Sequence, residues 1–292
     1  MIADRDENIK ILQIEQISVN ILQFTNLELE SDLTALTCFN YIYLIIALSN
    51  GVIKIWNIAY TQSLITFSSG HQQEITCLIS INNLYFATGS MDKSIIIWKT
   101  LDYSNYTISS KLTKHKGRIN SLLYISKRKY LLSTSSDTSF IIWKHLHDNL
   151  TMQKDLENAH SRQINDLIQL RNTNFLVSAS DDFTIKIWDT NNRYSNIDVL
   201  IGHTSDVYSI IELPHNRFAS CSKDKSIIIW NSTDFQLIKY LFAHLGPVIS
   251  LATIGDQYLA SGSCDSTIII WILTNEYQVK AIWYSGFNFT WF

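Results

Sequence analysis

Four residues recur five times along the chain in one order: a His, a Ser or Thr, an Asp and a Trp. The hydroxyl residue stands four positions before the Asp and the Trp six positions after it, while the His precedes the Asp by 21 or 22 positions. The five sets are His71, Thr88, Asp92, Trp98; His115, Ser133, Asp137, Trp143; His160, Ser178, Asp182, Trp188; His203, Ser220, Asp224, Trp230; and His244, Ser261, Asp265, Trp271. Counted from Trp56, successive Trp residues of the series are 41 to 45 positions apart. The chain is therefore expected to fold as a series of equivalent units.

Each repeat contains short segments typical of strands. Residues 95–98, 227–230 and 268–271 are apolar runs rich in Ile that end at polar turns. They are too short for helices and suit strands buried on both faces. A second such segment precedes each run, and the Asp lies in the tight turn between the two, which predicts a hairpin. With a third strand after each His and a fourth after each Trp, each repeat forms a four-stranded antiparallel blade. One blade cannot bury both of its faces, so an all-β propeller is predicted.

The same residues resemble the WD-repeat family. The Ser-x-Ser-x-Asp pattern followed by Ser or Thr two positions on, at 220–226 and 261–267, is typical of that family, and the resemblance covers roughly residues 17 to 284. The signature is partly eroded, because Gly precedes the His only at Gly70 and Gly202, and Asp follows the Trp only at Asp189. The resemblance implies that the Ser or Thr accepts a hydrogen bond from the Trp indole, that the His bonds the hydroxyl, and that the Asp holds the His. A buried indole N–H without a partner would cost roughly 1–3 kcal/mol.

The repeat predicts one propeller domain over residues 1–292, with clear repeats at about 26–272 and terminal strands at 9–24 and 277–292 that close the ring. Seven blades are favoured: six repeats and a partial blade assembled from both termini. A six-bladed ring with extra terminal strands, or a fragment of a longer protein, are the alternatives. The first repeat is degenerate, because Leu29, Ile46 and Asn50 occupy the places of the His, the hydroxyl and the Asp.

Ser, His and Asp together also suggest a hydrolytic triad. A nucleophile needs one activated site, however, and here the same trio recurs in five repeats, each time with a Trp that uses the hydroxyl. The trio is therefore interpreted as structural and the protein as noncatalytic. No Cys, His or carboxylate cluster has zinc-like spacing, so neither a metal nor a cofactor is predicted.

Composition narrows the classes of partner. A net charge of −3 provides no large basic field for nucleic acid. No apolar run reaches the 18 or more residues of a membrane span, and the N-terminus lacks the basic and apolar parts of a secretory signal. Direct nucleic-acid binding and membrane insertion are not expected. The expected location is the cytoplasm, with the nucleus as the alternative. The oligomeric state is left open.

The family resemblance implies that partners bind the face carrying the His loops and the Asp turns. By position, the third and fifth residues after each His and the residue before each Asp should point to that face. The partner-binding candidates chosen from these positions are Asp32, Glu74, Met91, Arg118, Asp181, Asp206, Tyr208, Lys223 and Ile249. Other residues at these positions are Thr34, Ser49, Thr76, Asn120, Ser136, Gln163, Asn165, Pro247 and Cys264. Acidic candidates outnumber basic ones, which favours a peptide or protein of mixed or slightly basic character.

These features predict an interaction scaffold or adaptor that binds protein or peptide partners in a multiprotein complex. The alternative is a substrate-recognition or sensor module of a larger protein, such as a ubiquitin ligase receptor or an NTPase-linked repeat protein. A longer reading frame with an added domain would distinguish the two.

Overall fold

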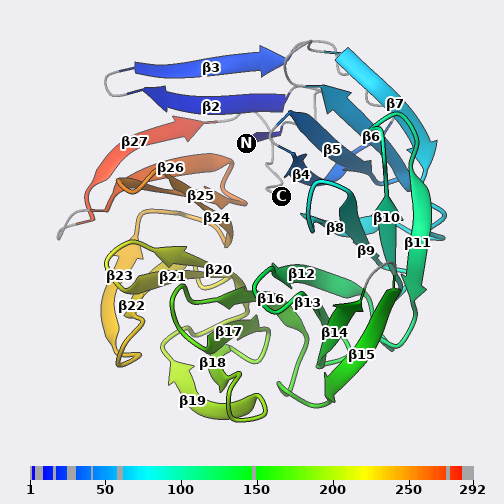
Figure 1. The fold of residues 1–292 in the computed structure, drawn as a ribbon. Coiled ribbons are helices and arrows are strands. Elements are labelled where there is room, and N and C mark those ends of the chain that lie inside the picture. Colours follow the sequence, from blue (N-terminus) through cyan, green and yellow to red (C-terminus); the bar gives the residue numbers. More distant parts are fainter. Residues whose placement is uncertain are drawn as a thin grey trace. The chain divides into compact units, whose positions relative to one another are not determined.

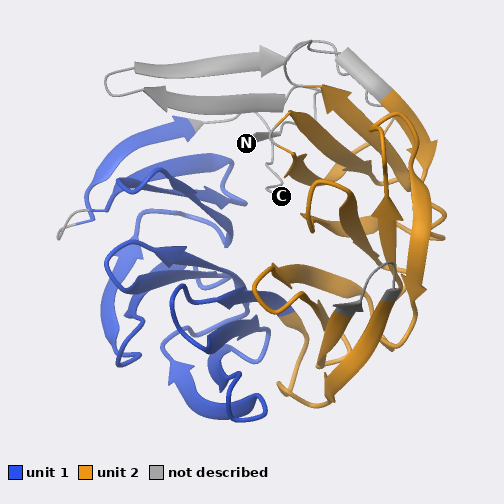
Figure 2. Cartoon of the chain, in the orientation of Figure 1, with its two compact units in different colours: residues 1–5, 10–22, 165–291 blue, residues 6–9, 23–164, 292 orange. Residues whose placement is uncertain are grey.

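The computed structural model describes residues 2–3, 9–15, 18–24, 31–40, 42–57, 62–146, 149–273 and 277–284. Within these residues the chain forms strands and turns and no helix. It divides into two compact units, of which unit 1 includes residues 165–291 and unit 2 includes residues 23–164 (Figure 2). Each four-stranded sheet is called a blade.

Unit 2 contains blades 1 to 3, in which the strands follow one another in chain order across each sheet. Blade 1 is β4 (Leu33–Phe39), β5 (Tyr43–Leu48), β6 (Val52–Asn57) and β7 (Gln62–Ser68). Blade 2 is β8 (Ile75–Ser80), β9 (Tyr85–Ser90), β10 (Ile95–Lys99) and β11 (Thr107–Leu112). Blade 3 is β12 (Ile119–Ile125), β13 (Tyr130–Ser135), β14 (Phe140–Leu146) and β15 (Asn149–Leu156). Figure 1 labels these strands.

Unit 1 contains blades 4 to 6, with the same strand order. Blade 4 is β16 (Ile164–Gln169), β17 (Phe175–Ser180), β18 (Thr184–Asp189) and β19 (Ser195–Ile201). Blade 5 is β20 (Val207–Leu213), β21 (Arg217–Ser222), β22 (Ser226–Asn231) and β23 (Leu237–Phe242). Blade 6 is β24 (Val248–Ile254), β25 (Tyr258–Ser263), β26 (Thr267–Ile272) and β27 (Val279–Tyr284). The predicted four-stranded antiparallel blades are therefore present for all six repeats.

The N-terminal segment forms a further sheet of three strands, β1 (Ile2–Ala3), β2 (Ile9–Glu15) and β3 (Ser18–Phe24). The predicted terminal strands at 9–24 coincide with β2 and β3. Within the predicted C-terminal strands at 277–292, residues 279–284 form β27 of blade 6, and residues 285–292 lie outside the described residues. Closure of the ring by both termini therefore stays a prediction, beside the six four-stranded blades that the structure shows.

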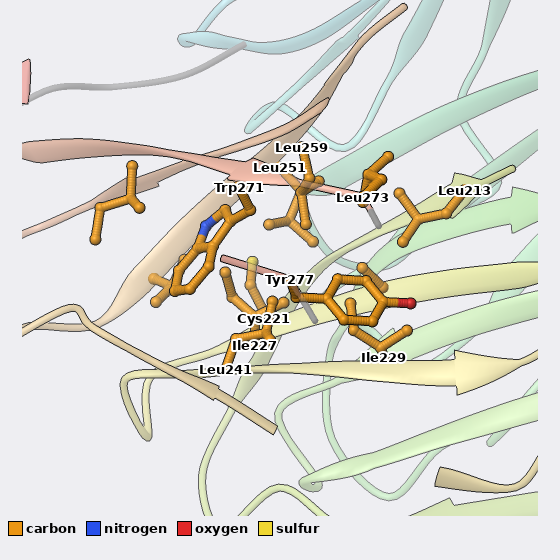
Figure 3. Close-up of a cluster of buried hydrophobic side chains, with 13 residues drawn as sticks. Leu213, Cys221, Ile227, Ile229, Leu241, Leu251, Leu259, Trp271, Leu273 and Tyr277 are labelled. Atoms are coloured by element: carbon orange, nitrogen blue, oxygen red, sulfur yellow. The ribbon is translucent and has the colours of Figure 1, made fainter. Parts of the chain in front are cut away.

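The apolar runs of blade 5 are buried on both faces because each face of this blade meets a neighbouring blade of unit 1. In β22, Ile227 and Ile229 pack in one cluster with Leu259 and Trp271 of blade 6 (Figure 3). Ile228 packs on the opposite side, in a cluster that contains residues of blade 4. Alternate residues of one strand therefore bury against different neighbours, which explains the continuous Ile pattern of the sequence.

A bulge marks the Trp position in every blade. The register between the third and fourth strands shifts at Trp56, Trp98, Trp143, Trp188, Trp230 and Trp271. The extra residue lies on the outer strand, as in the step from Ser110 to Ile108 opposite Ile97 and Trp98. Bulges of this kind increase local strand twist, so each repeat twists its outer strand at the same place.

Candidate interaction face

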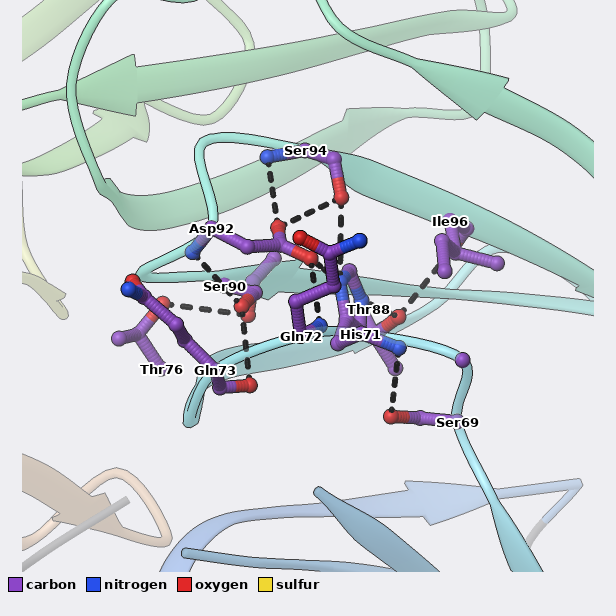
Figure 4. Close-up of polar contacts among 12 residues, drawn as sticks. Ser69, His71, Gln72, Gln73, Thr76, Thr88, Ser90, Asp92, Ser94 and Ile96 are labelled. Atoms are coloured by element: carbon purple, nitrogen blue, oxygen red, sulfur yellow. Dashed lines mark hydrogen bonds and ion pairs between the residues drawn. The ribbon is translucent and has the colours of Figure 1, made fainter. Parts of the chain in front are cut away.

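The four recurring residues meet in a single hydrogen-bonded network in blade 2, and Figure 4 shows His71, Thr88 and Asp92 of this network. His71 Nδ1 lies 3.0 Å from Asp92 Oδ2 and His71 Nε2 lies 2.8 Å from Thr88 Oγ1. The indole of Trp98 donates to Thr88 Oγ1 at 3.2 Å. An Nδ1–H that faces the carboxylate leaves Nε2 as an acceptor, so the Thr88 hydroxyl donates to the His and accepts from the Trp. All members of the network are therefore satisfied.

The same geometry recurs in blades 3, 5 and 6. The His Nδ1 to Asp distances are 3.0, 2.9 and 3.1 Å, and the His Nε2 to Ser distances are 2.8, 2.8 and 2.7 Å. In each of these blades the Trp indole donates to the Ser hydroxyl at 2.9 Å. In blade 4, Trp188 donates to Ser178 at 2.9 Å. The spacing in the sequence thus specifies one network, which joins the loop before a blade to its central hairpin.

Burial and hydrogen bonding within the network shift the pKa values of His71 and Asp92. Burial lowers the pKa of His71, against the opposing effect of Asp92. Burial alone would raise the pKa of Asp92, but hydrogen bonds from Ser94, Gln72 and His71 hold it well below its usual range. The His is therefore kept neutral and the Asp charged. Because the Thr88 hydroxyl already serves the Trp, it is not an activated nucleophile.

Backbone hydrogen bonds hold the predicted face positions together in pairs. In five blades the residue before the Asp donates its backbone N–H to the backbone carbonyl of the third residue after the His. In blade 1, Asn50 stands in the place of the Asp and Leu29 in the place of the His. These bonds are Ser49 to Asp32, Met91 to Glu74, Ser136 to Arg118, Lys223 to Asp206 and Cys264 to Pro247, at 2.8 to 3.0 Å. Both members of each pair therefore lie on one side of the blade, named here the His–Asp face.

Exposure on this face is uneven. Asp32 and Arg118 in unit 2 and Lys223 in unit 1 are exposed. The other candidates, Glu74 and Met91 in unit 2 and Asp181, Asp206, Tyr208 and Ile249 in unit 1, are partly exposed. In unit 1, Lys223 Nζ pairs with Asp206 Oδ2 at 3.0 Å. Burial raises the pKa of the neighbouring Tyr208, whose ring packs against the apolar cluster of blades 5 and 6. Tyr208 therefore packs partly against the core and is partly exposed on the His–Asp face.

The fifth position after the His has a role that the sequence did not reveal. Thr76 donates to Ile119 O at 2.5 Å, Asn120 to Ile164 O at 2.7 Å, and Asn165 to Val207 O at 2.7 Å. Ile119 and Val207 belong to the first strand of the next blade of the same unit, and Ile164 is the last residue of unit 2. Thr76 and Asn165 therefore link adjacent blades of one unit, and all three side chains bond a backbone carbonyl instead of pointing freely to a partner. The only signal in the sequence is the short polar side chain at that position.

We expect Asn120→Ala to lower the free energy of unfolding by about 1–2 kcal/mol, because it leaves the Ile164 carbonyl without this donor. The exposed Arg118, whose Nε donates to Asn120 Oδ1 at 2.8 Å, is the matched control. Arg118→Ala should cost less than about 0.5 kcal/mol. Urea unfolding followed by circular dichroism compares the two, and equal losses would contradict the assigned link.

Comparison with protein families decides the class of this protein. The family described as WD domain, G-beta repeat matches residues 61–99, 106–144, 152–189, 194–231 and 235–271. The chain belongs to the WD40 repeat family. The five matched WD40 repeats end at the Trp of each predicted set or one residue after it, so the predicted resemblance and the all-β propeller class are confirmed. The degenerate first repeat lies outside the matches. No curated protein matches the chain significantly.

Two properties of the described residues bear on the kind of site and on the membrane. Among those residues, no group of three or more His, Cys, Asp or Glu side chains is placed to hold a metal ion. The part of the chain that the structure describes also has no helix with the length and apolar character needed to cross a membrane. WD40 propellers generally serve as scaffolds for protein interaction, which agrees with a face built from paired surface turns.

Proposed function

We propose that this WD40 protein is a noncatalytic scaffold or adaptor that binds protein or peptide partners on the His–Asp face. The proposal rests on the different roles of two sets of residues within each repeat. The His, hydroxyl, Asp and Trp side chains are bonded to one another, while the paired positions beside them differ from blade to blade. A recurring hydrogen-bonded network that positions variable residues on the His–Asp face is suited to recognition of a specific partner.

The face of blades 5 and 6 in unit 1 supplies the most suitable chemistry. Tyr208 combines an anchored ring with partial exposure, and aromatic residues of this kind are frequent anchors in interfaces. Asp206 and Asp181 add to the rise in the pKa of Tyr208, which indicates that their charges act on its hydroxyl. Lys223 is the opposing charge. The balance favours a protein or peptide of mixed or slightly basic character, and we propose a cytoplasmic or nuclear setting for the complex.

A substrate-recognition or sensor role within a larger protein is the second candidate. It would use the same face, because the face belongs to the repeat and not to any additional domain. A longer reading frame that carries a ligase-linked or NTPase domain would favour this second role over a free-standing adaptor.

The test is an affinity purification from the native cell, with partners identified by mass spectrometry. We expect the double variant Asp206→Ala, Tyr208→Ala to lose a defined subset of partners. Because Tyr208 also packs in the core, wild type and variant should be compared at a temperature where both are fully folded by circular dichroism.

Asp256→Ala is the matched control, since Asp256 is an exposed carboxylate in the turn between β24 and β25 of the same unit. It should retain every partner. Retention of all partners by the double variant as well would exclude this part of the face as the binding site.

A further inference from the structure

The turn between β12 and β13 in blade 3 carries three successive basic residues, Lys127, Arg128 and Lys129 (Figure 1). The sequence contains no other run of three basic residues. Lys127 and Lys129 are exposed, and Arg128 is half-buried. The register of β13 and β14 pairs Tyr130 with Lys144, so a fourth, half-buried cation lies beside this turn. The four cations are named here the basic turn.

The basic turn is separate from the His–Asp face. Asp137 lies in the turn between β13 and β14, at the other end of β13. β13 has six residues, and a strand of this length spans about 17–20 Å. The basic turn contains none of the partner-binding candidates of the His–Asp face. A ligand of the basic turn is therefore independent of the function proposed for that face.

The cations of the basic turn do not stabilise the fold. Among the described residues, Lys127, Lys129 and Lys144 form no ion pair with a carboxylate. Neighbouring like charges repel one another. Lys129 also has a φ of 54°, in the left-handed region that Asn and Gly adopt more readily than Lys. Local costs of this kind are typical of functional sites.

The corresponding turns of other blades are built differently. In blade 4, Asn172 has a φ of 57°, and the single cation of the turn, Arg171, lies 3.1 Å from Glu212 Oε2 through its Nε. In blades 5 and 6, Asn216 and Gly255 take the positive φ, at 54° and 56°. The repeat therefore requires a residue that tolerates a positive φ in this turn, and it does not require a cluster of cations.

We propose that the basic turn binds an acidic segment of a partner protein, with several Asp or Glu residues in succession. Cations without counter-charges attract such a segment by electrostatic complementarity. The backbone N–H groups of Arg128 and Lys129 donate to Ile125 O and Ser126 O at 3.2 Å. These two donors are therefore not available to hold a single phosphate group in a backbone nest. The attraction comes from side chains on the turn and on β14, which suits several carboxylates along an extended segment.

The charge of the whole chain favours a short acidic segment over a long polyanion. The net charge is −3, which opposes the approach of nucleic acid, where binding depends on many phosphate contacts at once. The ligand also differs in charge from the mixed or slightly basic partner proposed for the His–Asp face. The two surfaces would therefore bind different segments.

The test uses a fluorescein-labelled peptide of eight Glu residues, with binding followed by fluorescence anisotropy at low salt. Wild type should bind it saturably, and added sodium chloride should weaken the binding. Lys129→Asn should weaken it by about two- to fivefold, the usual effect of losing one exposed charge pair. The Tm of this variant should not fall, because Asn adopts a positive φ more readily than Lys. Weaker binding would then not result from unfolding. Adding Lys127→Gln should weaken the binding further.

Lys225→Asn is the matched control, because Lys225 is also exposed and has a φ of 74°, in the turn between β21 and β22. It makes the same substitution and the same change in net charge, and it should keep the wild-type affinity. Equal weakening by Lys129→Asn and Lys225→Asn, or no binding to folded wild type, would overturn the site. Equal binding of a peptide of eight Gln residues would exclude charge as its basis.

A labelled octathymidine oligonucleotide and vesicles that contain phosphatidylserine test the other anionic ligands. Weaker binding of both than of the Glu peptide supports an acidic protein segment. Tighter binding of either one, with the same sensitivity to Lys129→Asn, would overturn the protein-partner part of the proposal.

Discussion

Replacing Trp230 with Ala should lower the free energy of unfolding by about 3–5 kcal/mol, the usual cost of deleting a large buried aromatic side chain. The Trp230 side chain is 2% exposed and stacks on Phe218 with ring centroids 6.2 Å apart. Its removal would leave a cavity in the cluster shared by blades 4 and 5. It would also remove the indole donor to Ser220, which His203 contacts as well. We expect a fall in Tm of about 10 °C, measurable by circular dichroism.

Phe242→Ala is the matched control for this result. Phe242 is also an aromatic residue of blade 5, but it is 73% exposed on the outer strand β23. Its truncation should cost less than about 1 kcal/mol. Trp230→Phe should fall between the two, because the ring is kept and the hydrogen bond is lost. Similar losses for Trp230→Ala and Phe242→Ala would contradict the assigned core.

Acid should unfold the protein steeply. Burial alone would raise the pKa of the network carboxylates Asp92, Asp137, Asp224 and Asp265, but hydrogen bonds from their His, hydroxyl and backbone partners lower it instead. For Asp265 the pKa falls to about 2. A carboxylate whose pKa is lowered by folding stabilises the native state above its ordinary value of 3.8. That contribution is lost as the pH falls toward the lower value, because the unfolded chain binds the proton first.

The four carboxylates should therefore make stability depend on pH with a slope that approaches about 5 kcal/mol per pH unit near pH 3, since each proton contributes about 1.4 kcal/mol. His71 and His244, whose pKa values burial lowers from 6.5, add a shallower loss that begins below neutral pH. Urea unfolding at a series of pH values and constant ionic strength measures the slope.

Asp224→Asn separates the network from general acid effects. It should lower stability at neutral pH, because the amide replaces one carboxylate oxygen that accepts from His203 or Ser226. It should also reduce the acid slope by about 1.4 kcal/mol per pH unit, since unfolding then takes up one proton fewer. Asp256→Asn, at an exposed turn, should change neither quantity. An unchanged slope in Asp224→Asn would show that the network does not control acid stability.

The blades and their internal networks could be predicted from the sequence because both depend on spacing within one repeat. The hydroxyl and the Trp lie on adjacent strands of a hairpin, so a separation of ten residues places Ser220 and Trp230 in register. The His and Asp then follow from the loop and turn that flank the hairpin. Local pairing of strands fixes these contacts, whichever blades lie beside them.

The contacts between blades were decided only by the tertiary structure. Whether Thr76 points to a partner or bonds the Ile119 carbonyl depends on how closely β8 approaches β12 in unit 2. In the same way, Tyr208 looks like a surface residue in the sequence but packs half into the cluster of blades 5 and 6. Repeat spacing specifies a blade, whereas the packing of one blade on the next decides which face positions remain available for binding.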